Sequence, residues 1–157
     1  MINQTLFSLM NGISGRYGFL DFIIMLFAVY GIYVVYCMCA YLHNLKQVFE
    51  AGTAALLGFG IKLAINYIYP IARPAGTLLI KLPSSPSFPS GHAVVSFAIA
   101  TAIFRHNKHL GAYAFLLALL ISISRIFAGV HYPLDILAGA VIGILCGFSV
   151  KYLFKKK

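Results

Sequence analysis

Five apolar stretches constrain this chain more than any other feature of its sequence. They cover approximately residues 19–42, 51–71, 91–104, 110–126 and 133–153. A helix needs about 20 mostly apolar residues to cross a bilayer, because the hydrocarbon core is roughly 30 Å thick. Backbone groups in lipid must be satisfied within the segment, which favours helices over open sheets. The sequence therefore predicts an all-α polytopic membrane helix bundle with five spanning helices, in a single membrane domain over residues 1–157.

The N-terminal segment, residues 1–16, differs from these stretches because polar residues interrupt its apolar ones. Its apolar positions follow helical spacing, and no basic region precedes them as in a signal peptide. They are Ile2, Leu6, Leu9, Met10 and Ile13. We expect an amphipathic N-terminal helix that lies in the membrane interface.

The charges indicate how the bundle is oriented. The chain is 61% hydrophobic and carries a net charge of +9, with 12 Lys+Arg against 3 Asp+Glu. The basic residues lie between apolar stretches and form no continuous patch, so a membrane surface is a better partner than nucleic acid. The positive-inside rule predicts a multi-pass membrane protein with a cytoplasmic C-terminus. Residues 72–89 and 125–135 would then face outward, toward the periplasm in a cell that has one.

A short turn near residue 130 combines charged groups that are scarce elsewhere. His131 precedes Asp135 by four residues, and Pro133 favours a helix start between them. Asp135 could hold one ring nitrogen of His131 and leave the other as a nucleophile. Alone, this pair is equally compatible with a structural hydrogen bond at a helix start. Charged partners on the same predicted side favour the catalytic interpretation.

Two further stretches supply those partners. Ser90 is a candidate N-cap, Gly91 allows a ligand close to the backbone, and His92 lies in the first helical turn. Arg73 and Asn66 are seven residues apart, which would place both on one helix face. Arg73 and Arg125 provide two planar guanidiniums, which match phosphate oxygens. The carboxylates are too few for a magnesium site, so we expect no metal and no cofactor.

Three motifs in this order resemble those of the membrane-bound type 2 phosphatidic acid phosphatase superfamily. Ser124, Arg125, His131 and Asp135 match one motif fully, and residues 89–92 match another. The remaining motif matches at Arg73 and Pro74, but Asn66 stands where most members have Lys. The resemblance implies a helical core and a phosphohistidine mechanism. In it His131 is the nucleophile, His92 is the general acid, and Arg73, Ser90, Gly91, Arg125 and Asn66 bind phosphate.

Within the superfamily, the chain looks like undecaprenyl pyrophosphate phosphatases of the bacitracin-resistance type. The replacement of the usual Lys by Asn66 and the opening residues 3–21 support this similarity. Gly91 is a difference, because that group commonly has Asp at this position. The expected substrate is undecaprenyl pyrophosphate. Phosphatidylglycerophosphate, phosphatidic acid or lipid A 1-phosphate are the alternatives within the class. A small non-enzymatic lipid binder or transporter is the alternative from another class.

Four other features have competing interpretations. Helical rise places Lys62 ~16 Å from Arg73, so Lys62 should pair with Asp21 or line a polar cavity. Asp21 itself is expected to cap or anchor the first span. His106 and His109 indicate a solvated basic turn rather than a metal pair. A stripe of small residues in the last stretch indicates close helix packing within the fold rather than a dimer face. The stripe consists of Gly139, Gly143 and Gly147.

Overall fold

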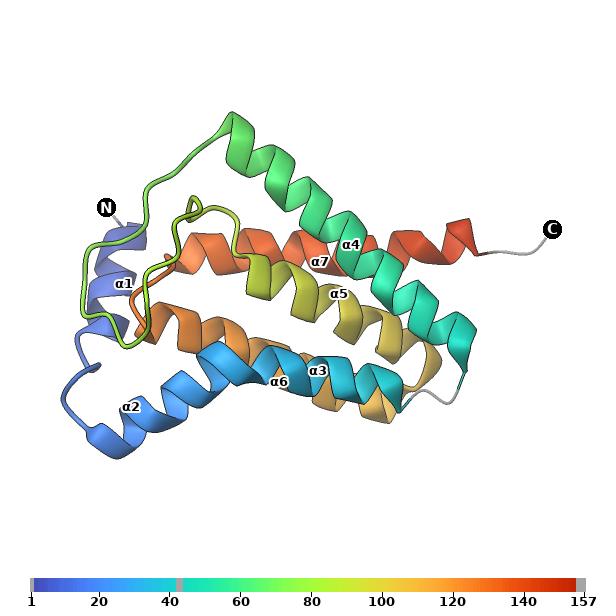
Figure 1. Cartoon of the computed structure of the whole chain (residues 1–157), viewed down its shortest axis with the longest axis horizontal. Helices are drawn as coiled ribbons and strands as arrows, with labels where there is room; N and C mark the ends of the chain where they lie inside the picture. Colours follow the sequence, from blue (N-terminus) through green and yellow to red (C-terminus); the bar gives the residue numbers. More distant parts are fainter. Residues whose placement is uncertain (1, 42–43, 155–157) are drawn as a thin grey trace.

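The computed structural model describes residues 2–41 and 44–154, and within these residues every regular element is helical. The elements are α1 (Ile2–Asn11), α2 (Gly18–Met25), the π-helical turn η1 (Leu26–Tyr30), α3 (Gly31–Ala40), α4 (Leu45–Ile68), α5 (Gly91–His106), α6 (Lys108–Phe127) and α7 (Pro133–Leu153). Figure 1 shows them as an elongated bundle beside a long irregular connection between α4 and α5. The predicted all-α class is confirmed.

Four helical segments in this part of the chain are long and apolar enough to span a membrane. They are Gly18–Ala40, Leu45–Ile68, Lys108–Phe127 and Pro133–Leu153. The predicted third span is instead a helix of 16 residues, α5, which is shorter than these four. The structure therefore supports four candidate spans, and it does not confirm the predicted five.

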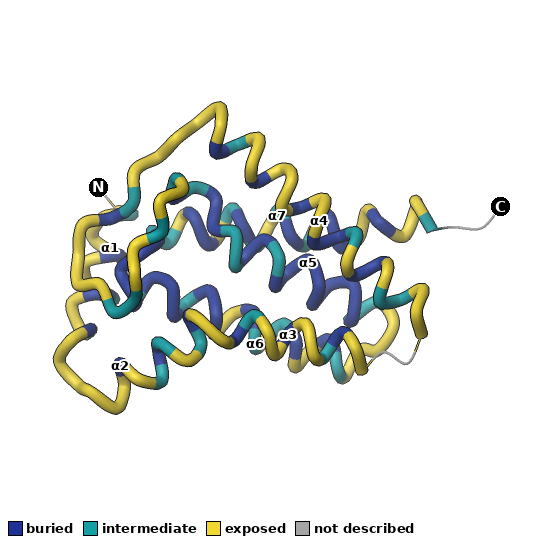
Figure 2. Tube along the Cα trace, in the orientation of Figure 1, coloured by how far each residue is buried: buried dark blue, intermediate teal, exposed yellow. Residues whose placement is uncertain are grey.

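Helix α5 forms the centre of the bundle. Nearly every residue from Ala93 to Ile103 is buried, and α5 packs against α3, α4, α6 and α7. Figure 2 shows this burial along α5, whereas the outer faces of the other helices are exposed. Those outer faces are apolar, as expected for helices that contact lipid. Examples are Leu56, Leu119 and Leu145.

The glycine stripe of α7 lets that helix approach α5 closely. A Cβ at Gly139 would lie 2.8 Å from the Ser90 carbonyl oxygen, and one at Gly147 would lie 2.5 Å from Thr101 Cβ. Side chains at these positions would push α5 and α7 apart. The prediction that the stripe serves packing within the fold is confirmed. This close contact places the start of α5 beside the start of α7.

Helix α4 differs from its predicted boundaries of Ala51 and Ile71. It begins at Leu45, where the Asn44 side chain accepts a hydrogen bond from the Lys46 amide at 3.0 Å. It ends at Ile68, because Tyr69 precedes a proline and such residues avoid the α conformation. Arg73 is therefore in an extended segment. The prediction that Asn66 and Arg73 share one helix face is wrong.

The predicted solvated turn at residues 105–109 is also wrong in part. Helix α5 continues to His106, and α6 begins at Lys108. Glu50 pairs with Arg105 at 3.3 Å and with His106 at 2.9 Å, which ties α4 to α5 at this end of the bundle. Within residues 2–41 and 44–154 no cluster of three or more potential metal ligands forms. Parts of two other predictions, Leu42–His43 and the basic residues 155–157, lie outside the described residues.

Helix α1 forms as predicted, but one side of it packs against protein. The Phe7 ring meets the Tyr132 ring at 5.5 Å between centroids. Asn11 Nδ2 donates to the carbonyls of Thr77 and Phe127, both at 2.8 Å, and Asn11 Oδ1 accepts from the Thr77 amide at 2.8 Å. Helix α1 thus holds together the two connections that face it.

Asp21 anchors the start of the first span, as predicted. It lies in the first turn of α2, and its carboxylate accepts a hydrogen bond from the Gly15 amide at 3.0 Å. The α4–α5 connection, the α6–α7 turn and α1 all lie at one end of the bundle (Figure 1). The polar stretches predicted to share one side therefore do so.

Candidate active site

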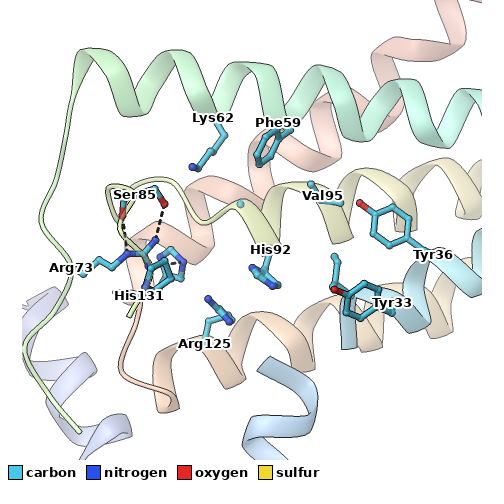
Figure 3. A pocket seen from close by; sticks show the side chains of 13 residues that line it. Tyr33, Tyr36, Phe59, Lys62, Arg73, Ser85, His92, Val95, Arg125 and His131 are labelled. Carbon is cyan, nitrogen blue, oxygen red and sulfur yellow. Dashed lines mark hydrogen bonds between the residues drawn. The ribbon is translucent and has the colours of Figure 1, made fainter. Parts of the chain in front are cut away.

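The α4–α5 connection, the start of α5 and the α6–α7 turn meet at a pocket of about 400 Å³ at this end of the bundle (Figure 3). Its chemically reactive or charged lining residues come from five segments: Lys62, Arg73, His92, Arg125 and His131. Gly91 contributes backbone at the start of α5. No carboxylate lines the pocket among the residues that the structure describes, so its electrostatic potential favours anions.

His131 lies in the turn between α6 and α7 and is only 3% exposed. Gly129 makes this turn possible, since its φ of +80° is strained for a residue with a side chain. His131 Nδ1 lies 3.3 Å from Asp135 Oδ2, and the residue lines the pocket. With the proton on Nδ1, donated to Asp135, Nε2 carries the lone pair that a nucleophile needs, and Arg73 Nη1 lies 3.3 Å from it.

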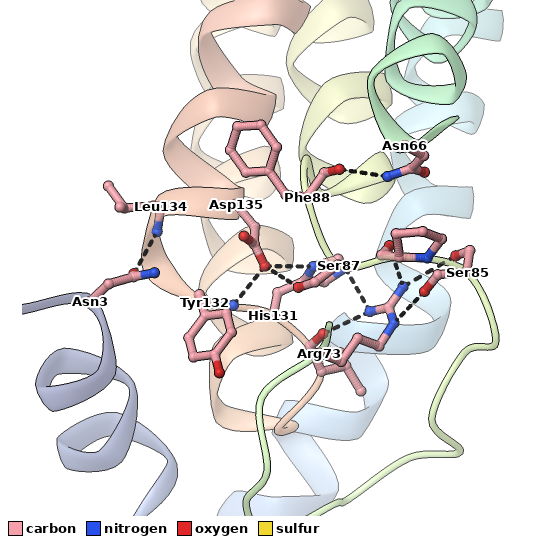
Figure 4. A network of polar contacts seen from close by, with 12 residues as sticks. Asn3, Asn66, Arg73, Ser85, Ser87, Phe88, His131, Tyr132, Leu134 and Asp135 are labelled. Atoms are coloured by element: carbon pink, nitrogen blue, oxygen red, sulfur yellow. Dashed lines mark hydrogen bonds and ion pairs between the residues drawn. The ribbon is translucent and has the colours of Figure 1, made fainter. Parts of the chain in front are cut away.

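Asp135 has further donors that fix its carboxylate (Figure 4). Asp135 Oδ2 accepts a hydrogen bond from the Tyr132 amide at 2.8 Å and another from Ser87 Oγ. Ser87 is fully buried and belongs to the α4–α5 connection. Sequence reasoning missed Ser87, because nothing in its local pattern distinguishes it from the other serines of that connection.

The pKa of His131 is lowered to about 4. Burial of the ring is the largest cause, and the positive charges of Arg73 and Arg125 add to it. The hydrogen bond to Asp135 opposes this shift but does not reverse it. At neutral pH the imidazole is therefore uncharged, which is the form that a nucleophile requires.

Arg73 connects the α4–α5 connection to the His131 turn. Its Nε donates to the Ser85 carbonyl at 2.9 Å, and Nη1 donates to the Val130 carbonyl at 2.7 Å. Nη2 lies 3.3 Å from both Ser85 Oγ and the Pro86 carbonyl oxygen. Burial lowers the pKa of this guanidinium, and Asp135 raises it. Arg73 both orders the backbone around the pocket and brings positive charge to His131.

Arg125 enters the pocket from the last turn of α6. Its Nη1 donates to the Ala28 carbonyl at 2.7 Å, and Ala28 belongs to the π-helical turn η1. Such turns leave carbonyls outside the regular α-helical ladder and are frequent at functional sites. Arg125 Nε is buried and has no hydrogen-bond partner within the described residues. An anion in the pocket would satisfy this donor.

The start of α5 is built from Ser90, Gly91 and His92. Ser90 occupies the predicted N-cap position, but its side chain makes no capping hydrogen bond. Its amide donates to the Asp135 carbonyl at 3.0 Å, and its buried Oγ has no partner in the part of the chain that is described. Gly91 and His92 line the pocket, and Ser90 does not.

Asn66 is placed differently from expectation, whereas Lys62 lines a pocket, which is one of the two placements expected for it. Asn66 does not line the pocket, because its Nδ2 donates to the Phe88 carbonyl at 2.5 Å. Lys62 does line the pocket, together with Arg73. The predicted long separation of these two cations assumed one continuous helix, and that assumption fails beyond Ile68. Lys62 forms no ion pair with Asp21 in the described structure.

A carboxylate-supported histidine, a second histidine and two arginines lie around an anion pocket at one end of this helical membrane bundle. This arrangement is typical of a membrane phosphatase site. The chain belongs to the PAP2 superfamily, whose family model matches residues 51–157. Members of this superfamily that match the chain include an undecaprenyl-diphosphatase and a phosphatidylglycerophosphatase of Bacillus subtilis, which are hydrolases of membrane lipid phosphates. The resemblance expected from the three motifs is confirmed.

Individual relatives resemble the chain over most of its length. The undecaprenyl-diphosphatase BcrC of Bacillus subtilis is 31% identical over 94% of this chain and 81% of its own. A protein of Bacillus licheniformis named bacitracin transport permease protein BcrC is 31% identical over 95% of this chain and 79% of its own. The crystal structure of Aquifex aeolicus LpxE superposes with a TM-score of 0.85 at 35% identity, covering 97% of this chain and 96% of that one.

Proposed function

We propose that this protein removes the terminal phosphate of undecaprenyl diphosphate at the outer face of a bacterial plasma membrane. The products would be undecaprenyl phosphate and inorganic phosphate. The observation that carries the proposal is His131, which lines an anion pocket while Asp135 Oδ2 lies 3.3 Å from its Nδ1 and Arg73 Nη1 lies 3.3 Å from its Nε2. The similarity to an undecaprenyl-diphosphatase over 94% of this chain supports the choice of lipid.

The first chemical step would transfer the terminal phosphoryl group to His131. Nε2 attacks the terminal phosphorus, and the bond from that phosphorus to the bridging oxygen breaks. His92 donates a proton to the departing oxygen of the lipid phosphate. Arg73, Arg125 and the first amides of α5 neutralise the equatorial oxygens, where negative charge accumulates.

The second step would release the phosphate. His92, now neutral, takes a proton from water as the water oxygen attacks the phosphorus of phosphohistidine. The phosphorus–nitrogen bond breaks, inorganic phosphate leaves, and both histidines return to their starting forms. Asp135 keeps the His131 ring in one orientation through both steps. The route uses only side chains and backbone amides of this chain, and the cationic lining favours an anion over a divalent metal.

A second cavity indicates where the lipid chain would lie. It has a volume of about 340 Å³ and shares Tyr36, Phe59 and Val95 with the anion pocket. Its other lining residues are Gly52, Ala55 and Leu56, so it follows the face of α4 away from the site. We infer that the prenyl chain enters laterally beside α4, which leaves the head group at His131. The basic residues 46, 105, 108 and 151 at the opposite end favour an outward-facing site.

Transport is the rival proposal, because the B. licheniformis relative is named a bacitracin transport permease. A transporter needs a polar path across the membrane, but the polar pocket here lies at one end of the bundle. It also needs no nucleophile held by a carboxylate. Turnover distinguishes the two proposals, because only the phosphatase requires His131 for a chemical product.

The decisive experiment measures phosphate release by detergent-purified protein in the presence of EDTA. Undecaprenyl diphosphate, phosphatidic acid and phosphatidylglycerophosphate would be offered side by side, with His131→Ala and His92→Ala as variants. We expect release that survives EDTA, is fastest with undecaprenyl diphosphate, and is nearly abolished in both variants. Release by His131→Ala at the wild-type rate would disprove the mechanism, and faster hydrolysis of another lipid would reassign the substrate.

A further inference from the structure

We infer that Lys62 binds the lipid-proximal phosphate of a diphosphate head group and thereby makes the site select diphosphate lipids over monophosphate lipids. This inference rests on the proposed function and specifies how the site would recognise its substrate. Lys62 is then a specificity-determining residue that acts on the leaving group. It replaces in space the positive charge that Asn66 does not provide.

The first observation is that Lys62 is buried without an anionic partner. It is 7% exposed and lies on α4 within a membrane-spanning segment. No carboxylate or hydrogen-bond acceptor pairs with its ammonium group in the described residues. Its ammonium group lies over the Phe59 ring, whose centroid is 5.6 Å from Nζ. Burying a cation without a counter-ion costs free energy. A bound anionic ligand would supply the missing counter-ion.

The second observation is where Lys62 lies relative to the reacting groups. It passes over the start of α5, since Lys62 Cε would lie 3.7 Å from a Cβ built on Gly91. Figure 3 shows its side chain pointing from α4 into the pocket, across from Arg125. Lys62 therefore lines the same pocket as His92, the residue that would protonate the leaving oxygen.

The third observation is the continuity between the site and the apolar cavity. Phe59, which contacts Lys62, lines both cavities. A lipid chain in the apolar cavity would join its head group at Phe59, and the terminal phosphate would reach His131 at the far side. The phosphate next to the lipid would then lie between these points, within reach of Lys62.

The charges of the two substrate classes make this contact selective. A phosphate monoester carries about −1.5 to −2 charges at neutral pH. A diphosphate ester has one further ionised phosphate, and that phosphate must leave with its charge. Arg73 and Arg125 serve the terminal phosphate in both classes. Lys62 adds a third cation that only the diphosphate can engage fully.

The geometry of α4 explains why position 66 does not take this role. The Asn66 side chain turns to the Phe88 carbonyl at 2.5 Å and supports the connection that leads into α5. Its Oδ1 is buried without a partner in the described part of the chain. Lys62, one helical turn earlier, faces the pocket instead.

The test compares Lys62→Met with the wild type on undecaprenyl diphosphate and undecaprenyl phosphate. Met keeps most of the side-chain volume and removes the charge. We expect kcat/KM to fall about tenfold or more for the diphosphate and less than about threefold for the monophosphate, as loss of a close charge contact predicts. Lys62→Arg should retain more of the preference. Lys81→Met, at an exposed position of the α4–α5 connection, is the matched control and should change neither rate.

An equal loss on both lipids, or no loss on either, would overturn the inference about Lys62. Thermal unfolding of each variant separates these results from misfolding, because loss of an unpaired buried charge should not lower the Tm. If the wild type hydrolyses no lipid, the proposed function fails and a binding experiment decides the role of Lys62. Inorganic diphosphate should then bind Lys62→Met more weakly than the wild type, while orthophosphate binds both equally. Unchanged diphosphate binding would also overturn the inference.

Discussion

Arg73 Nη1 lies 3.3 Å from His131 Nε2, although the two residues are 58 positions apart in the chain. The same guanidinium donates to the Val130 carbonyl and to groups of the α4–α5 connection. One side chain thus sets the position of the candidate nucleophile and the shape of the backbone around it. This dual role gives the first of five predictions.

Arg73→Lys should lower kcat/KM by about a hundredfold or more, because an ammonium group cannot reproduce a planar guanidinium with several fixed donors. The α4–α5 connection should also become more susceptible to proteolysis. Phosphate release and limited proteolysis measure the two effects. Arg16→Lys, at an exposed position, is the control. Activity within about threefold of the wild type would show that charge alone suffices at position 73.

Arg125→Ala should lose nearly all phosphatase activity. The substitution removes a buried guanidinium whose Nη1 is fixed by the Ala28 carbonyl and whose Nε has no partner in the described structure. Arg125→Lys should recover only a small part of the rate, because Lys cannot bond Ala28 and a phosphate in the same fork geometry. Steady-state kinetics on the best lipid substrate test this. Full recovery by Lys would contradict the expected geometry.

Ser87→Ala should lower kcat by about tenfold, since Asp135 would lose one of the donors that fix its carboxylate. With one hydrogen bond fewer to its negative charge, the Asp135 carboxylate would attract the protonated form of His131 more strongly. The pKa of that imidazole would therefore rise. The acid limb of the pH–rate profile should therefore move to higher pH. Ser84→Ala, an exposed serine of the same connection, provides the comparison. An unmoved acid limb would leave Ser87 with a structural role only.

The activity of the free enzyme should persist into acidic solution. The pKa of His131 is about 4, compared with an ordinary value of 6.5, so its nucleophilic form remains populated well below pH 6. The acid limb of kcat/KM should fall with a midpoint near this pKa. Since the folded-state pKa is lowered, the unfolded chain binds more protons between the two values. Stability should therefore decrease as the pH falls from about 6.5 toward 4.

The stability part of this prediction has its own control. His131→Gln removes the titrating group, so its Tm should depend less on pH than the Tm of the wild type over that window. Parallel curves for the two proteins would contradict a lowered pKa at His131. The rate profile is measured separately on the wild type.

Asn11→Ala should destabilise the protein by about 1–3 kcal/mol, because it leaves buried backbone groups of two connections without partners. Asn11 makes three hydrogen bonds to Thr77 and Phe127, whereas Asn3 makes a single exposed one to the Leu134 amide. Asn3→Ala should therefore change the Tm little. Equal Tm values for both variants would mean that α1 does not brace the site.

Local features of the sequence predict a large part of this protein. Apolar stretches of sufficient length predict the spanning helices, and α7 has the predicted bounds Pro133 and Leu153 because a proline begins it. The glycine stripe predicts close packing within the fold, and the structure shows that the partner of α7 there is α5. The types and spacing of His92, Arg125, His131 and Asp135 indicate phosphate chemistry, and the family confirms that class.

Only the tertiary structure places Lys62, Ser87 and Asn66. Helix α4 ends at Ile68, and the chain after it folds back over the bundle, which brings Arg73 into the same pocket as Lys62. The same fold carries Ser87 to Asp135, 48 positions away, and turns Asn66 to the Phe88 carbonyl. Helical periodicity and hydropathy depend on neighbours within one or two turns. Contacts made by an irregular connection depend on which hydrogen-bond partners its buried polar groups have. Those partners come together only when the helices pack.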